Sequence, residues 1–166
     1  MRRAHGSELS GWTRAALEAD GFTGWTPFAQ LKTTRPPRVP GVYVVLRAAS
    51  TPVEFLQASI GGWFKGLDPT VAQEILEADW VDGATVVYVG KAKNLRTRLG
   101  QYRRYGEGKP AAHQGGRYIW QLADSSELLV AWLPSLDEAP QILETRLIAA
   151  FRAAHSGYRP FANLKD

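Results

Sequence analysis

Apolar residues concentrate at a few points along the chain, and their spacing predicts strands and helices. Residues 41–45 and 86–89 are rich in valine and tyrosine, which is typical of buried strands. After the second strand, Gly90 permits a sharp turn and Asn94 suits the N-cap of a helix. Three apolar side chains of that helix recur at i, i+4 and i+7: Leu95, Leu99 and Tyr102. Residues 86–104 are therefore predicted to form a strand, a turn and a helix.

Further helices are predicted at both ends of the chain and between the two valine-rich strands. They cover residues 10–19, residues 67–80 with Asp68 as N-cap and Pro69 at the first position, and residues 140–155. Residues 21–28 are rich in glycine and aromatic residues, which favours a turn-rich arm packed on the core. Residues 117–122 and 127–133 predict either a hairpin or a short element followed by a core strand.

The segment between the two strands, residues 47–84, contains the aromatic pair Trp63 and Phe64 flanked by glycines and Lys65. We expect these rings to fold onto the core in preference to the alternative, exposed rings that stack on bases or wedge into a duplex.

Length and composition predict a single domain over residues 1–166, with residues 1–40 as an N-terminal arm. The chain has 166 residues, 45% of them hydrophobic, enough for one sizeable core. No apolar run reaches the length of a membrane span, so we expect a soluble, cytoplasmic protein. Cysteine is absent, which excludes disulfides and thiolate metal sites, and the three histidines are too scattered to indicate a zinc site by their spacing. A bound metal would have oxygen ligands, as Mg²⁺ or Mn²⁺ prefers.

Positive charge is concentrated in the segment that contains the predicted basic helix. The net charge is +4, and residues 91–117 hold eight Lys or Arg against the single acid Glu107. Such a basic face is expected of a protein that binds a phosphate backbone. The candidate contacts are Lys93, Arg96, Tyr102, Arg103, Arg104, Lys109 and Arg117, with His113 in the following loop. The alternative is a solvated basic helix that binds no nucleic acid.

Five features in a fixed order resemble the GIY-YIG nuclease family. They are GVY at residues 41–43, YVG at residues 88–90, Arg98 ten residues after Tyr88, Glu144 on the last predicted helix, and Asn163 near the end. The family usually joins the two tyrosine strands by a short connection, so residues 47–84 are an insertion. Some members carry a histidine one helical turn after the arginine, where this chain has Tyr102.

The resemblance implies an α/β (α+β) fold, a small antiparallel sheet flanked by helices. It implies an endonuclease that uses Mg²⁺ or Mn²⁺ to hydrolyse phosphodiester bonds, with DNA favoured over RNA. By the same resemblance Glu144 holds the metal, Arg98 contacts the scissile phosphate, and Tyr43 or Tyr88 activates water, with Tyr43 preferred. The expected supporting residues are Lys91, Asn163 and His113.

Three alternatives stay open from the sequence. Glu144 falls at the border of its helix's apolar stripe, where an ion pair with an arginine would also explain a half-buried carboxylate. The chain as a whole is either an enzyme or a nucleic-acid-binding module without catalysis. It is also compatible with a protein-interaction domain that uses its basic face for an acidic partner.

Overall fold

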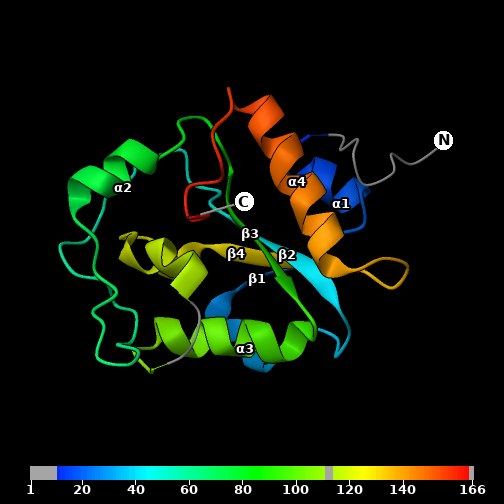
Figure 1. Ribbon diagram of the computed structural model, residues 1–166, viewed down its shortest axis with the longest axis horizontal. Helices are drawn as coiled ribbons and strands as arrows, with labels where there is room; N and C mark the ends of the chain where they lie inside the picture. Colours follow the sequence, from blue (N-terminus) through cyan, green and yellow to red (C-terminus); the bar gives the residue numbers. More distant parts are fainter. Residues whose placement is uncertain (1–10, 111–113, 165–166) are drawn as a thin grey trace.

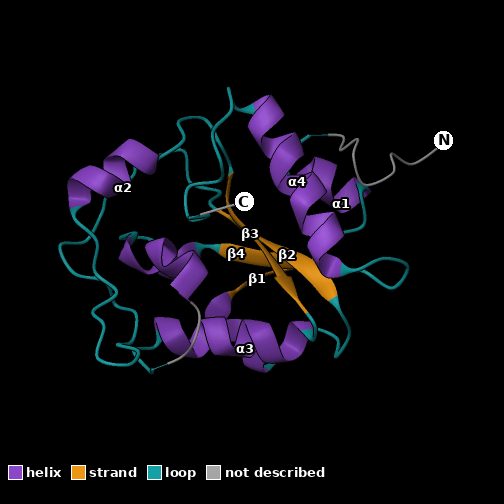
Figure 2. Cartoon of the chain, viewed as in Figure 1, coloured by secondary structure: helices purple, strands orange, loops and turns teal. Residues whose placement is uncertain are grey.

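A four-stranded antiparallel sheet forms the centre of the computed structural model, which describes residues 11–110 and 114–164 (Figures 1 and 2). The strands are β1 (Thr23–Pro27), β2 (Gly41–Leu46), β3 (Val86–Ala92) and β4 (Leu129–Pro134), in the spatial order β1-β4-β2-β3. The predicted α+β class with a small antiparallel sheet is confirmed. The two tyrosine strands β2 and β3 lie side by side, and β3 is at the edge of the sheet.

Helices cover both faces of the sheet, which explains why every residue of β2 is buried. On one face lie α1 (Arg14–Ala19) and α4 (Pro140–Ala154), packed on Val42 and Val44. On the other face lie α3 (Leu95–Gly106) and the short 3₁₀ helices η1 (Phe28–Lys32) and η2 (Gln114–Gln121), which share a core cluster with Tyr43 and Val45. A further 3₁₀ helix, η3 (Ser125–Glu127), precedes β4. Side chains alternate along β2, so each face supplies one core cluster.

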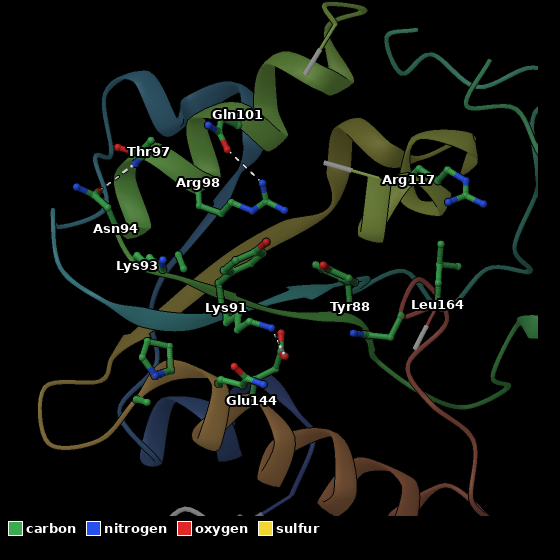
Figure 3. A pocket seen from close by; sticks show the side chains of 16 residues that line it. Tyr88, Lys91, Lys93, Asn94, Thr97, Arg98, Gln101, Arg117, Glu144 and Leu164 are labelled. Atoms are coloured by element: carbon green, nitrogen blue, oxygen red, sulfur yellow. Dashed lines mark hydrogen bonds and ion pairs between the residues drawn. The ribbon is translucent and has the colours of Figure 1, made fainter. Parts of the chain in front are cut away.

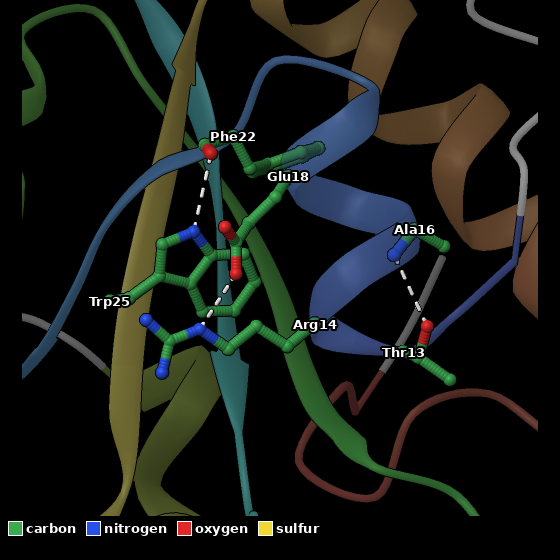
Figure 4. A network of polar contacts seen from close by, with 6 residues as sticks. All are labelled: Thr13, Arg14, Ala16, Glu18, Phe22 and Trp25. Carbon is green, nitrogen blue, oxygen red and sulfur yellow. Dashed lines mark hydrogen bonds and ion pairs between the residues drawn. The ribbon is translucent and has the colours of Figure 1, made fainter.

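The N-terminal region differs from the sequence prediction in two ways. Helix α1 begins at Arg14, because Thr13 is its N-cap and accepts a hydrogen bond from the backbone of Ala16 (Figure 4). The segment predicted as a turn-rich arm contains strand β1 instead. Gly24 lies so close to the Trp132 ring that a Cβ there would be 2.5 Å from it, so this glycine serves strand packing rather than a turn.

A short polar network attaches α1 to strand β1 (Figure 4). Arg14 donates to Glu18 at 2.8 Å, and its guanidinium lies 5.2 Å from the centre of the Trp25 ring. The Trp25 indole nitrogen donates to the carbonyl of Phe22. Trp25 has a φ of 52° at an irregularity in the pairing of β1 with β4, which local sequence does not reveal.

The insertion contains one helix, α2 (Gln73–Asp79), which starts later than predicted. Asp68 accepts from the backbone of Thr70 in a turn rather than capping the helix, and Ala72 occupies the N-cap. Residues 117–122 lie mainly in the 3₁₀ helix η2, so the predicted hairpin is wrong. The other reading, a short element followed by the core strand β4, is confirmed.

The aromatic pair of the insertion does not fold onto the core as expected. Trp63 is 60% exposed and Phe64 is half-buried. The backbone of the loop makes the contact instead: the Gly62 N–H donates to the carbonyl of Tyr105 at 2.9 Å. A Cβ on Gly62 would lie 1.9 Å from the carbonyl oxygen of Lys109, so glycine is needed there for the close approach of two backbones.

Within the described ranges, no helix is both long enough and apolar enough to cross a membrane. The last helix, α4, begins at Pro140 as predicted and ends one residue before His155. It contacts β3 and β2 and thereby brings Glu144 beside the tyrosine strands.

Candidate active site

A cavity of about 970 Å³ opens where the edge strand β3 passes between α3 and α4 (Figure 3). Its lining comes from β2, β3, α3, η2, the start of α4 and the C-terminal segment. The residues are Tyr43, Tyr88, Lys91, Ala92, Lys93, Asn94, Thr97, Arg98, Gln101, Arg117, Ala139, Pro140, Gln141, Glu144, Asn163 and Leu164. All five features of the family resemblance therefore border one cavity.

The two tyrosines are placed by the pairing of their strands. Tyr43 on β2 lies opposite Gly90 on β3, and a Cβ at that glycine would be 2.3 Å from the Tyr43 ring. Gly90 is therefore required so that the Tyr43 ring can lie across β3. The centre of this ring lies 6.0 Å from the centre of the Tyr88 ring. The GVY and YVG motifs are linked by this contact, because the glycine of one makes space for the tyrosine of the other.

Both phenols are buried, which raises their pKa. Tyr43 is 1% exposed, and its pKa lies well above the usual value because of burial and the neighbouring Tyr88. Burial, followed by the charge of Glu144, raises the pKa of Tyr88 to about 12. The positive charge of Arg98 lowers the pKa of both phenols.

A hydrogen bond joins the two phenols, so the loss of a proton from one affects the other. Tyr88 has 7% of its surface exposed, against 1% for Tyr43, so Tyr88 is the more accessible of the two from the cavity. The sequence favoured Tyr43 as the proton acceptor, and the choice between the two phenols stays a prediction.

Glu144 reaches the cavity from the first half of α4 and is only 13% exposed. Its Oε1 lies 3.2 Å from the Nζ of Lys91 on β3 (Figure 3). The carboxylate is half-buried, as its place on the border of the helix stripe predicted, but its partner is a lysine rather than an arginine. The side chains of Tyr88 and Lys91 point to opposite faces of β3, and both line the cavity. The cavity therefore extends to both faces of this edge strand.

Arg98 and three polar neighbours form one face of α3 toward the cavity. Arg98 donates to the Oε1 of Gln101 at 3.2 Å, and the N-cap Asn94 accepts from the backbone of Thr97 at 3.1 Å (Figure 3). Sequence reasoning singled out Arg98 and used Asn94 only as a cap. The spacing i, i+3, i+4, i+7 from Asn94 would have revealed this polar face, since residues so spaced share one side of a helix.

Asn163 supports the edge strand rather than the cavity interior. Its Oδ1 accepts from the backbone N–H of Val89 at 2.9 Å, and its Nδ2 donates to the carbonyl of the same residue at 2.8 Å. Both ends of the amide are thus used by β3, directly between Tyr88 and Gly90. Asn163 was expected to support the site, and in the structure it does so by bonding the backbone of the strand that carries Tyr88.

The expected nucleic-acid contacts fall into separate places. Lys93 and Arg117 line the cavity. Three arginines, Arg96, Arg103 and Arg104, lie around a second groove on another side of α3. Lys109 follows α3 and lies 3.8 Å from Glu107.

Two other expected contacts have different outcomes. Tyr102 is completely buried, and its hydroxyl donates to the carbonyl of Gly116 at 2.5 Å. Its expected contact with nucleic acid is therefore wrong, because it belongs to the apolar stripe of α3. His113 lies outside the described residues.

The cavity suits a metal held partly by substrate. Among the described residues that line it, Glu144 is the sole carboxylate. In the described part of the chain, no three Asp, Glu or His side chains gather as a metal site. Mg²⁺ commonly binds through one or two carboxylates plus water and substrate phosphate, which these residues fit. A site built wholly from protein ligands does not fit them.

Comparisons of the chain with protein-family models, curated proteins and solved structures found no match. The case for a function therefore rests on the residues of the cavity and their chemistry.

Proposed function

We propose that the protein is a divalent-metal-dependent endonuclease of the GIY-YIG type that hydrolyses phosphodiester bonds, in DNA rather than RNA. One observation carries the proposal: two buried phenols, a guanidinium and a half-buried carboxylate, from four separate elements, border one open cavity. Packing alone does not require this combination at a surface opening, because buried polar side chains are usually satisfied within the core.

The cations of the cavity provide phosphate recognition. The guanidinium of Arg98 offers several N–H donors in a plane that matches two phosphate oxygens, and Lys93 and Arg117 add charge on either side. Such donors, held by α3 and η2 before substrate arrives, stabilise the charge that develops on the phosphate during attack.

Tyr88 is the proposed proton acceptor for the attacking water, because it is the more exposed of the two phenols that line the cavity. With a pKa of about 12, its phenolate costs about 7 kcal/mol at pH 7. That pKa already includes the lowering by Arg98, so the remaining stabilisation must come from other positive charge. A single further cation at roughly 4 Å offsets about 4 kcal/mol at an effective dielectric of 20. A divalent cation bound by Glu144 would supply further positive charge at the phosphate and the leaving oxygen. Lys91 pairs with one oxygen of this carboxylate, Oε1, so a metal at Glu144 would compete with that ion pair.

The test is the substitution Glu144→Gln, which keeps the size of the side chain and removes its charge. We expect Mg²⁺-dependent cleavage of duplex DNA to fall at least 100-fold, with binding in EDTA retained. The matched control is Glu138→Gln, which breaks another carboxylate–cation pair with α4, between Glu138 and Arg146, neither of which is among the described lining residues of the cavity. Cleavage by Glu144→Gln at the wild-type rate would refute the proposal.

The Lys91–Glu144 ion pair favours a second candidate, a nucleic-acid-binding module without catalysis. In that case the pair is a permanent surface contact, worth at most about 1 kcal/mol because Lys91 is half-exposed. The same experiment separates the candidates. A binding module gives no Mg²⁺-dependent cleavage by the wild type, and Glu144→Gln then changes only stability and affinity.

A further inference from the structure

A second, smaller groove of about 340 Å³ lies on another side of α3, between this helix and the segment that follows η1. Its described lining comprises Leu31, Lys32, Arg35, Pro36, Arg38, Arg96, Gly100, Arg103 and Arg104. Six of these nine residues are Lys or Arg, and none is acidic. Three of the cations, Lys32, Arg35 and Arg38, precede β2 and were not among the basic residues singled out from the sequence.

Helix α3 presents three distinct faces. Its buried face packs on the core through Leu95, Leu99 and Tyr102. Residues 94, 97, 98 and 101 line the large cavity, whereas residues 96, 100, 103 and 104 line the second groove. At about 100° per residue, the two exposed faces are about 120° apart, so one helix separates the two openings.

Three of the groove's five described arginines donate to a backbone carbonyl or to a carboxylate. Arg96 donates to the carbonyl of Pro36 at 2.8 Å, and Arg35 donates to that of Lys32 at 3.3 Å. Arg103 donates to Glu107 at 2.7 Å. Burial acts to raise the Glu107 pKa, but Arg103, Lys32 and Lys109 outweigh it and the pKa is lowered. Glu107 therefore stays ionised and offsets one of the six positive charges, leaving a large excess.

Gly100 is the independent sign that something approaches this surface closely. It lies in the middle of α3, where glycine is less stable than alanine. Packing does not require it, because a Cβ would meet only the end of the Arg104 side chain, at an ordinary 3.5 Å. A glycine without a packing reason, between arginines in a concave surface, leaves room for a ligand against the helix backbone.

We propose that this groove binds the sugar-phosphate backbone of a nucleic acid at a position away from the phosphate in the large cavity. The proposal rests on the proposed function for the identity of the ligand. Two faces of one helix are about 10 Å apart, which corresponds to roughly three nucleotides at 3.4 Å per step. The same strand, or its complement, can therefore occupy both openings across α3.

The test uses three variants of the full chain: Gly100→Ala, Arg35→Gln with Arg38→Gln, and the control Arg14→Gln. Arg14 is exposed on α1, on the opposite face of the sheet (Figure 1). Affinity for a fluorescent 20-base-pair duplex is measured in EDTA over a range of salt, together with Tm. Cleavage by the wild type is measured separately in Mg²⁺.

We expect Gly100→Ala to raise Tm and yet weaken duplex binding several-fold, a combination that a purely structural glycine does not produce. The double arginine variant should weaken binding at least tenfold at low salt and reduce the salt slope by about two. Arg14→Gln should bind like the wild type. If the double variant bound the duplex with wild-type affinity, the proposed groove would be refuted. Affinity for polyglutamate is measured in the same way. If the double variant lost as much affinity for polyglutamate as for the duplex, or more, the groove would be assigned to an acidic protein partner and the proposal would also be refuted.

The groove and the nuclease can fail separately. If the wild type cuts DNA but the groove variants bind duplex normally, the groove is refuted and the nuclease stands. If the wild type does not cut, and the groove variants lose duplex affinity, the nuclease is refuted and the phosphate groove stands.

Discussion

At the scale of single residues, the unusual feature of the molecule is a cluster of buried phenols beside an open cavity. Tyr102 lies 5.6 Å from Tyr88 and 6.4 Å from Tyr43, measured between ring centres. Burial is the main reason why the pKa of each is raised. An uncharged phenol is accommodated by its neighbours, whereas a phenolate in the same place lacks hydration.

This cluster predicts loss of stability at high pH. Above pH 10.0 the unfolded chain releases phenolic protons that the folded chain retains up to about pH 12, as for Tyr88. The free energy of unfolding should therefore fall as pH rises through this window, by about 1.4 kcal/mol per pH unit for each such tyrosine. Urea unfolding at pH 8, 9, 10 and 11 measures the slope, and Tyr88→Phe should remove one tyrosine's share. The prediction would be contradicted if the folded protein showed tyrosinate absorbance at pH 10 that Tyr88→Phe removes.

At the scale of elements, the edge strand β3 depends on the C-terminal segment. The Ala162 N–H donates to the carbonyl of Val87 at 2.8 Å, and Asn163 pairs with both polar groups of Val89. These contacts satisfy backbone groups that an edge strand would otherwise expose, and they hold the part of β3 that carries Tyr88.

Asn163→Ala should therefore destabilise the protein by about 1–3 kcal/mol, because the backbone N–H and carbonyl of the buried Val89 lose their partners. Chemical denaturation measures the change. Asn163→Asp is the matched variant, since its carboxylate still accepts from the Val89 N–H but cannot donate to the carbonyl, and we expect a loss of similar sign. Unchanged stability in both variants would mean that water replaces the amide fully.

At the scale of the whole molecule, the insertion between β2 and β3 is attached by apolar side chains and by a few polar anchors. Leu76 is fully buried in the core, and Phe55 and Trp80 pack against it. The Gln121 side chain donates to the carbonyls of Leu56 and Val71 and accepts from the Val71 N–H. The largely buried Arg47 pairs with Asp124 at 2.8 Å. These anchors hold the segment while Trp63 stays exposed.

Trp63→Ala should accordingly leave Tm within about 2 °C of the wild type, since little apolar surface is lost from the core. If the ring stacks on a base, duplex affinity should fall by roughly 1–3 kcal/mol. Trp120→Ala is the contrasting variant: that ring is 4% exposed, and its removal should cost about 3–5 kcal/mol. A large loss of Tm in Trp63→Ala would show that the loop packs more tightly than its exposure indicates.

Local pattern was enough to predict the elements whose apolar periodicity and end signals agree. Strands β2 and β3, the helix α3 with its Asn94 cap, and α4 from Pro140 all follow from such signals, which act within a few residues. Strand β1 was missed because Gly24 and Pro27 read as turn residues. Its strand form comes from pairing with β4, more than 100 positions later, which no local pattern contains.

The same division holds for the candidate site. The order of the tyrosine motifs, Arg98 and Glu144 in the sequence predicted a shared site by resemblance, and their residue types predicted its chemistry. Only the tertiary structure decided which groups meet: Glu144 with Lys91, Asn163 with the Val89 backbone, and Tyr102 with the core. It also decided that Lys32, Arg35 and Arg38 join the arginines of α3 in a second groove. The physical reason is distance along the chain, because hydrophobic spacing acts within an element, whereas pairing partners and burial are set by how distant elements pack.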